Sequence, residues 1–192
     1  KTNKFNNQIK NSILEINNKF NLKLSDVTYK LNLNNFSINI TTKKSQLLIE
    51  NSKIDINNIK TNVSLKSLIN DQFSIDDLQI STAEVKINDL ISLTRAIHNT
   101  PQLFILNKII KEGSIEADIN INFDNQGKVK DNYQIKGFVK NTRLDLLNKS
   151  NVKDLSFSFD VTKNKYLLNK ISATFNKIKL NSPLIQIEKK KD

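Results

Sequence analysis

The sequence predicts a mainly β fold with helical insertions. The expected shape is an elongated, curved antiparallel β-meander that forms a groove, with an N-terminal helix and a central helical hairpin. Three observations indicate this class: apolar and polar residues alternate through most of the chain, the polar clusters between alternating runs are short, and two segments have helical spacing. Alternation with one polar face favours antiparallel strands, because parallel strands covered on both faces have continuous apolar runs.

The first expected element is an amphipathic helix over residues 1–20. Its apolar residues recur every three or four positions and form one stripe of Phe5, Ile9, Ile13, Ile16 and Phe20. The chain begins at Lys1 and contains no methionine. We therefore expect an excised or processed segment of a longer protein.

Residues 21–88 are expected to form a first antiparallel meander. Its alternating runs are Val27–Leu33, Phe36–Ile40, Ile54–Ile56, Val63–Leu65, Phe73–Ile75, Leu78–Ile80 and Val85–Ile87. Asn34–Asn35 and Asn57–Asn58 are interpreted as turns, because asparagine tolerates left-handed backbone conformations. The acidic pair Asp76–Asp77 is placed in a solvated turn beside a strand, and not in an acid–base site.

Residues 89–113 interrupt the alternation and are expected to form a helical hairpin. Thr100 followed by Pro101 is a typical N-cap and first-turn signature for the second helix. Gly113 is expected to cap the C-terminus of that helix.

Residues 114–188 are expected to form a second antiparallel meander, followed by a basic tail over residues 189–192. Its runs are Ile115–Phe123, Tyr133–Val139, Leu155–Val161, Ile171–Phe175, Ile178–Leu180 and Ile185–Ile187. The polar clusters Asp124–Lys128, Thr162–Lys165 and Asn181–Pro183 are interpreted as loops between strands.

Composition argues against an enzyme. The chain has no cysteine, which excludes a disulfide framework, a thiolate metal site and a cysteine nucleophile. The single histidine, His98, has no acidic or nucleophilic partner nearby in the sequence, so we interpret it as a loop residue. Three glycines provide no phosphate-binding loop. We expect no catalytic residues, no metal site and no cofactor.

The net charge of +11 does not by itself indicate a nucleic-acid partner. The 30 Asn, 28 Lys and 26 Ile residues all have A/T-rich codons, so a biased genome explains much of the lysine excess. Only Arg95 and Arg143 are arginines, whereas nucleic-acid binders favour arginine and clustered basic residues. A nucleic-acid partner is not expected. For the basic tail, contact with anionic lipid headgroups is the alternative, and we favour a solvated tail.

The expected strands carry more apolar surface than the expected helices can cover. Either the sheet folds on itself, or it curls into a trough with an apolar interior. The sequence leaves open which residues face a groove and which pack against helices. The groove candidates are Ile38, Ile40, Ile54, Ile56, Ile75, Ile80, Ile119, Ile121, Phe157, Phe159, Ile171 and Phe175.

From Leu22 to Lys189 the chain resembles the AsmA-like family of Gram-negative envelope proteins. The likeness is carried by patterns of strand and turn: the helical interruption NTPQLFILNKIIKEG, the two Gly-x-Val triplets between Gly127 and Val139, the short run Thr142–Leu146, and the closing Phe175–Ile187 stretch. The resemblance implies a periplasmic β-groove segment of a long protein anchored to the inner membrane.

The resemblance also implies a function without chemistry. Family members are thought to carry phospholipids between the inner and outer membranes, so the expected partners are phospholipid acyl chains, with attachment to the membrane through an anchor outside this sequence. An alternative of a different class is a structural envelope domain that binds a protein partner through a sheet edge.

Overall fold

The structure is a computed structural model that describes residues 20–49, 52–66, 75–97, 100–124, 130–146 and 150–189. The helix expected over residues 1–20 lies outside these ranges, except for Phe20, which begins a strand. His98, Phe73 and most of the loop expected at Asp124–Lys128 also lie outside them.

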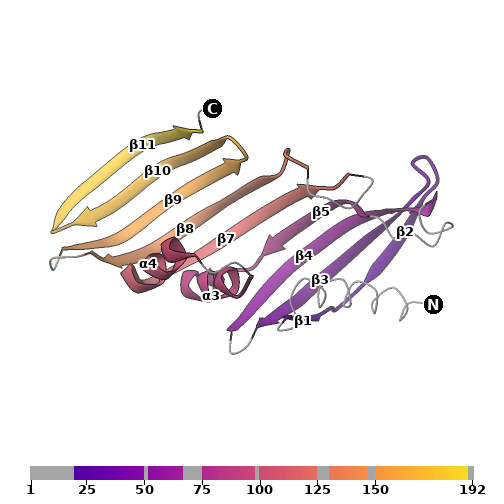
Figure 1. The fold of residues 1–192 in the computed structure, drawn as a ribbon, viewed down its shortest axis with the longest axis horizontal. Helices are drawn as coiled ribbons and strands as arrows, with labels where there is room; N and C mark the ends of the chain where they lie inside the picture. The colour runs from indigo at the N-terminus through magenta and orange to yellow at the C-terminus, as the bar shows by residue number, and fades with distance from the viewer. Residues whose placement is uncertain are drawn as a thin grey trace.

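The described strands form one open, curled antiparallel sheet of eleven strands, which confirms the predicted fold class. Its order is β1-β3-β4-β5-β7-β8-β9-β10-β11. Two short strands lie off this path: β2 pairs with β3, and β6 pairs with β7. Figure 1 shows the strands following one another along the long axis of the molecule. The bounds are β1 Phe20–Lys23, β2 Thr28–Asn32, β3 Ser37–Ile49, β4 Ser52–Ser64, β5 Ile75–Thr82, β6 Val85–Lys86, β7 Ile110–Asn122, β8 Gln134–Asp145, β9 Asn151–Thr162, β10 Lys165–Phe175 and β11 Ile178–Glu188.

The long strand β3 changes its apolar parity in the middle. Lys43 and Lys44 are both exposed, and the hydroxyls of Thr42 and Ser45 on either side of them meet at 2.5 Å. Side chains three residues apart in a regular strand point to opposite faces, so this contact requires both lysines to lie on the other face. Lys44 accordingly has a positive φ of 56°.

The same interruption recurs across the sheet. Positive φ values at Asn141, Asp154 and Lys170, and shifts of register in β4, β7, β8, β9 and β10, mark equivalent bulges. We use the name bulge band for the pairs of residues that share the polar face at these points: Lys43–Lys44, Asn57–Asn58, Ala83–Glu84, Lys111–Glu112, Lys140–Asn141, Lys153–Asp154, Asn169–Lys170 and Pro183–Leu184.

Three predicted turns are wrong, and the bulge band explains two of them. Asn57–Asn58 lies inside β4 and Asn181–Pro183 lies inside β11, whereas the sequence predicts turns at both places. A bulge and a turn both change the apolar parity, but only a turn reverses the chain. Asp76–Asp77 also lies within a strand, β5, where the pairing with β4 shifts its register between Asn62 and Val63.

Two predicted turns are confirmed. Residues 33–36 connect β2 to β3 at the expected Asn34–Asn35, and the side chain of Asn32 accepts hydrogen bonds from the backbone N–H groups of both residues. β9 ends at Thr162 and β10 begins at Lys165, as expected. The β10–β11 turn at Asn176–Lys177 was not predicted, and both of its residues have positive φ.

The helical hairpin comprises α3, Ile87–Ile97, and α4, Pro101–Ile109. Thr100 caps α4 as predicted, because its side chain accepts a hydrogen bond from the backbone N–H of Leu103. The predicted C-cap at Gly113 is wrong: Ile110 already begins β7, where pairing with β8 takes over. Gly113 instead has a φ of +139° inside β7.

The core lies between the sheet and this hairpin. α3 packs against β4, β6 and β7, and α4 packs against α3 and β7 (Figure 1). One cluster of buried residues contains Leu22, Ile54, Ile56 and Val85, and a second contains Ile87, Ile91, Ile110 and Val139. The hairpin therefore covers the middle of one face of the sheet.

Candidate functional site

The twelve predicted groove residues all lie on one face of the sheet, which we call the apolar face. Directly paired residues of neighbouring strands share a face. The pairing links Ile38 to Val63 and Val63 to Ile75 at one end of the sheet, and Phe159 to Leu168 near the other. The remaining candidates follow by alternation on either side of the bulge band, and Ile80 pairs directly with Ile119.

Covered residues occupy the N-terminal part of the apolar face. Ile40, Ile54 and Ile56 are buried, and Ile54 and Ile56 belong to the first core cluster. Val63 has no exposed surface at all. These side chains already have their apolar contacts, so they are not free to contact a ligand in this conformation. The other nine candidates are half-buried.

Phe157 and Phe159 lie where the covered part of the apolar face ends. Their rings are 6.5 Å apart in an edge-on arrangement, and both pack against the second core cluster. Gly137, the partner of Phe159 on β8, makes room for its ring: a Cβ there would lie 2.5 Å from the Cζ atom of Phe159. The two rings extend the hairpin's contacts toward the C-terminal strands.

Beyond these rings the apolar face is bare. Ile178 and Leu180 on β11 are 63% and 50% exposed, although their partners on β10 place them on the same face as Phe175. The exposed apolar side chains at this end form what we call the bare strip, which consists of Tyr166, Ile178, Leu180, Ile185 and Ile187. Residues 150–189 contain no buried side chain.

The bare strip was not among the predicted site residues. Four of its five residues belong to runs that the sequence predicts as strands: Ile178 and Leu180 in one, Ile185 and Ile187 in the other. Their exposure depends on β11 being the last described strand of the sheet, which is a property of the topology. The apolar residues have even numbers before Pro183 and odd numbers after it. This change of alternation is the sequence signal that both runs belong to one strand with a bulge.

The outer edge of β11 has features that disfavour pairing with another strand. The two-residue turn with positive φ at both positions makes Phe175 and Ile178 a hydrogen-bonded pair. Polar-face residues of β11 therefore direct their backbone groups away from β10. Pro183 is one of them, and its missing N–H removes a donor from the outer side of the strand.

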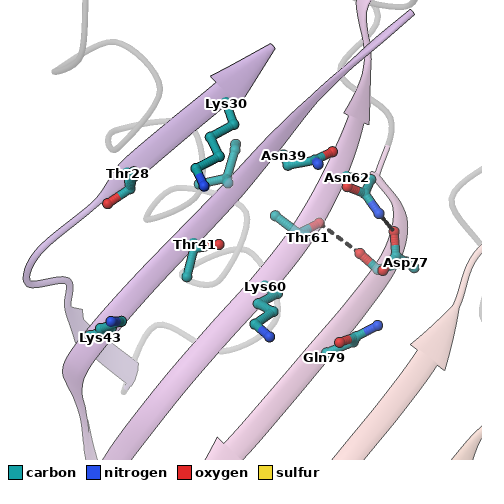
Figure 2. A pocket seen from close by; sticks show the side chains of 11 residues that line it. Thr28, Lys30, Asn39, Thr41, Lys43, Lys60, Thr61, Asn62, Asp77 and Gln79 are labelled. Atoms are coloured by element: carbon teal, nitrogen blue, oxygen red, sulfur yellow. Dashed lines mark hydrogen bonds between the residues drawn. The ribbon is translucent and has the colours of Figure 1, made fainter. Parts of the chain in front are cut away.

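The polar face contains a hollow of about 410 Å³ over β2, β3, β4 and β5 (Figure 2). Lys30, Lys43 and Lys60 are among its lining residues. The backbone oxygen of Asp77 accepts a hydrogen bond from the Thr61 hydroxyl at 2.7 Å, and its carboxylate accepts one from the Asn62 amide at 2.6 Å. Asp77 is thus engaged in cross-strand bonds, as expected for the solvated side of a sheet.

Charged groups also cluster at the bulge band between β6, β7 and β8. Lys140 Nζ lies 2.6 Å from Glu116 Oε1 and 3.6 Å from Glu84 Oε2, and the Ser114 hydroxyl lies 2.5 Å from Glu84 Oε1. The hydrogen bond from Ser114, together with Lys140, lowers the pKa of Glu84. The hydrogen bond to Glu116 raises the pKa of Lys140. These opposite shifts both favour the charged forms.

In the part of the chain that the structure describes, no three His, Cys, Asp or Glu residues are grouped to hold a metal ion. Among the same residues, no helix is long and apolar enough to cross a membrane. What the geometry offers is an extended apolar surface, covered at one end and bare at the other.

Comparisons with known proteins add no assignment. No protein-family model matches the chain, and no curated protein or solved structure matches it significantly. The likeness to the AsmA-like family therefore stays a prediction based on the sequence pattern.

Proposed function

We propose that this chain binds lipid acyl chains on its apolar face and performs no chemical step. The observation that carries the proposal is that the apolar face continues past the hairpin, through Phe157 and Phe159, to the bare strip on β11. Each bulge places two successive residues on the polar face, so each strand is longer on that face than on the apolar face. We infer that the sheet curls toward the apolar face.

The apolar face can bind an acyl chain favourably and still let it move along the surface. Burying an acyl chain contributes about 0.8 kcal/mol per CH2 group. Isoleucine, leucine and phenylalanine side chains repeat from strand to strand, so a chain lying across the strands has many similar contacts and no single deep minimum. Such a surface lets a lipid slide while its headgroup stays in water.

In the wider context that the family resemblance implies, the chain is a segment of an AsmA-like periplasmic protein anchored to the inner membrane. It would support phospholipid transport between the inner and outer membranes and thereby outer-membrane assembly. This part of the proposal is supported by the strand and turn patterns between Leu22 and Lys189.

Native mass spectrometry of the detergent-free protein tests lipid binding directly. We expect co-purifying phospholipid in the unaltered chain and its loss in a Leu180→Asp/Ile187→Asp variant. Both residues are exposed, so this variant should fold. A Leu33→Asp variant is the control, because Leu33 is equally apolar and exposed but lies in the β2–β3 turn. Lipid-free protein after incubation with phospholipid would contradict the proposal.

The alternative is an envelope scaffold that binds a protein partner through the edge of β11. Within the described residues nothing pairs with the outer side of β11, which leaves backbone groups free for an added strand. Pro183 and Lys179 on that side disfavour the addition. Replacing Pro183 with Ala should strengthen a strand partner and leave lipid binding unchanged, so this variant separates the two functions.

A further inference from the structure

The helix α4 is mostly apolar, yet it lies at the surface of the protein. Eight of its nine residues are uncharged, Lys108 is the other, and no side chain of the helix is buried. Phe104, Ile105 and Leu106 are consecutive and all exposed. Since consecutive residues of a helix lie about 100° apart, they cover the whole outer side of α4. The helix packs on α3 and β7 with its other side.

Two cationic groups lie beside the Phe104 ring of this apolar surface. The guanidinium of Arg95, from α3, lies 5.5 Å from the centre of the Phe104 ring, and the ammonium of Lys108 lies 4.7 Å from it. α4 itself has no acidic residue. A cation held beside an exposed aromatic ring is placed to pair with a lipid phosphate while the neighbouring apolar side chains enter the membrane interface.

We propose that α4 docks the protein on anionic phospholipid bilayers, with Phe104, Ile105 and Leu106 entering the interface and Arg95 and Lys108 contacting lipid phosphates. At 1.5 Å per residue, nine residues span about 13.5 Å, far less than the roughly 30 Å hydrocarbon core, so α4 lies along the surface. The proposal concerns α4 alone and does not depend on acyl-chain binding by the sheet.

Tryptophan fluorescence of the full chain tests the docking, because the sequence contains no tryptophan. We compare Ile105→Trp with Leu33→Trp, since Ile105 and Leu33 are 56% and 71% exposed. Vesicles of phosphatidylcholine mixed with phosphatidylglycerol should shift the emission of Ile105→Trp to the blue and leave that of Leu33→Trp unchanged. Vesicles of phosphatidylcholine alone should shift neither.

Co-sedimentation with the same anionic vesicles separates insertion from general attraction. We expect Ile105→Ser and Lys108→Gln each to reduce the bound fraction at least about threefold. Leu33→Ser and Lys179→Gln should change it little, although Lys179→Gln alters the net charge equally. Equal losses in Lys108→Gln and Lys179→Gln, or an unshifted Ile105→Trp spectrum, would overturn the proposal. A dimer that Ile105→Ser dissociates would assign the surface to a second copy and would overturn it too.

Acyl-chain binding by the apolar face and docking of α4 on bilayers can fail separately. Protein that carries phospholipid but does not sediment with anionic vesicles would contradict only the docking. Protein that sediments but remains lipid-free by native mass spectrometry would contradict only the proposed function.

Discussion

The N-terminal and C-terminal halves of the sheet have the same strand pattern and different cover. β3 and β4 contribute Ile40, Ile54, Ile56 and Val63 to the apolar face, and all four are buried. β10 and β11 contribute the bare strip to the same face. Alternation in a sequence thus establishes that a strand has an apolar face, and packing by other elements decides whether that face becomes core or binding surface.

The first and largest test of this contrast replaces the same residue type in both halves. Ile54 is 3% exposed and Ile187 is 55% exposed. Ile54→Ala should lower the free energy of unfolding by about 2–5 kcal/mol, because it leaves a cavity in the core. Ile187→Ala should change it by only about 0.5 kcal/mol. Urea denaturation measures both, and equal losses would show that the two halves are packed alike.

The second test addresses the boundary between the halves. At Gly137 an added Cβ would lie 2.2 Å from the backbone oxygen of Glu116 and 2.5 Å from the Phe159 ring. Gly137→Ala should therefore cost about 1–3 kcal/mol of unfolding free energy, as overpacking does. Ser172→Ala, on the polar face of β10, is the control and should be nearly neutral. Thermal unfolding followed by circular dichroism provides the comparison, and an unaffected Gly137→Ala variant would show that the Glu116 backbone and the Phe159 ring both shift at little cost.

The third test asks whether the bulge band behaves alike in both halves. Lys44 in β3 and Lys170 in β10 have φ values of 56° and 52°. Relief of left-handed strain should make Lys44→Gly and Lys170→Gly each more stable by up to about 1 kcal/mol. Lys179→Gly, in a regular part of β11, should instead lose about 0.5–1 kcal/mol. Denaturation midpoints that fall in all three variants would argue against strain at the bulges.

The smallest expected effect concerns the charges at the bulge band. The folded-state pKa of Glu84 is lowered from 4.5, so its stabilising contribution is present above that pH and disappears as the pH falls below it. The pKa of Lys140 is raised from 10.5, so its contribution disappears as the pH rises beyond that value. Both side chains are partly exposed to solvent, which screens their charges, and the effect should be slight.

NMR titration of the Glu84 carboxyl measures this effect. In Ser114→Ala the midpoint should move up toward 4.5, because the largest cause of the shift is the hydrogen bond from Ser114. The remaining attraction of Lys140 should keep it slightly below that value. An unchanged midpoint would show that Ser114 does not donate to Glu84 in solution.

Much of the fold followed from the sequence, because alternation, turn residues and the Thr100–Pro101 cap are local signals. The bulges inside strands were harder to predict: Asn57–Asn58 resembles a turn until its pairing partners Lys43 and Ser81 are known. The candidate site was predicted as a set of residues sharing one face. The separation of buried Ile54 from half-buried Phe175 depends on where distant segments pack, and no local pattern encodes that.

The bulge band also bears on how such a chain tolerates insertions and deletions. Removing one residue from a regular strand turns every later side chain to the opposite face. Removing Lys170 would leave Leu168, Asn169 and Ile171 in simple alternation, so both ends of β10 would keep their apolar side chains on the apolar face. Single-residue length changes should therefore accumulate at the bulges during evolution, where they alter the bend of one strand and preserve the apolar surface.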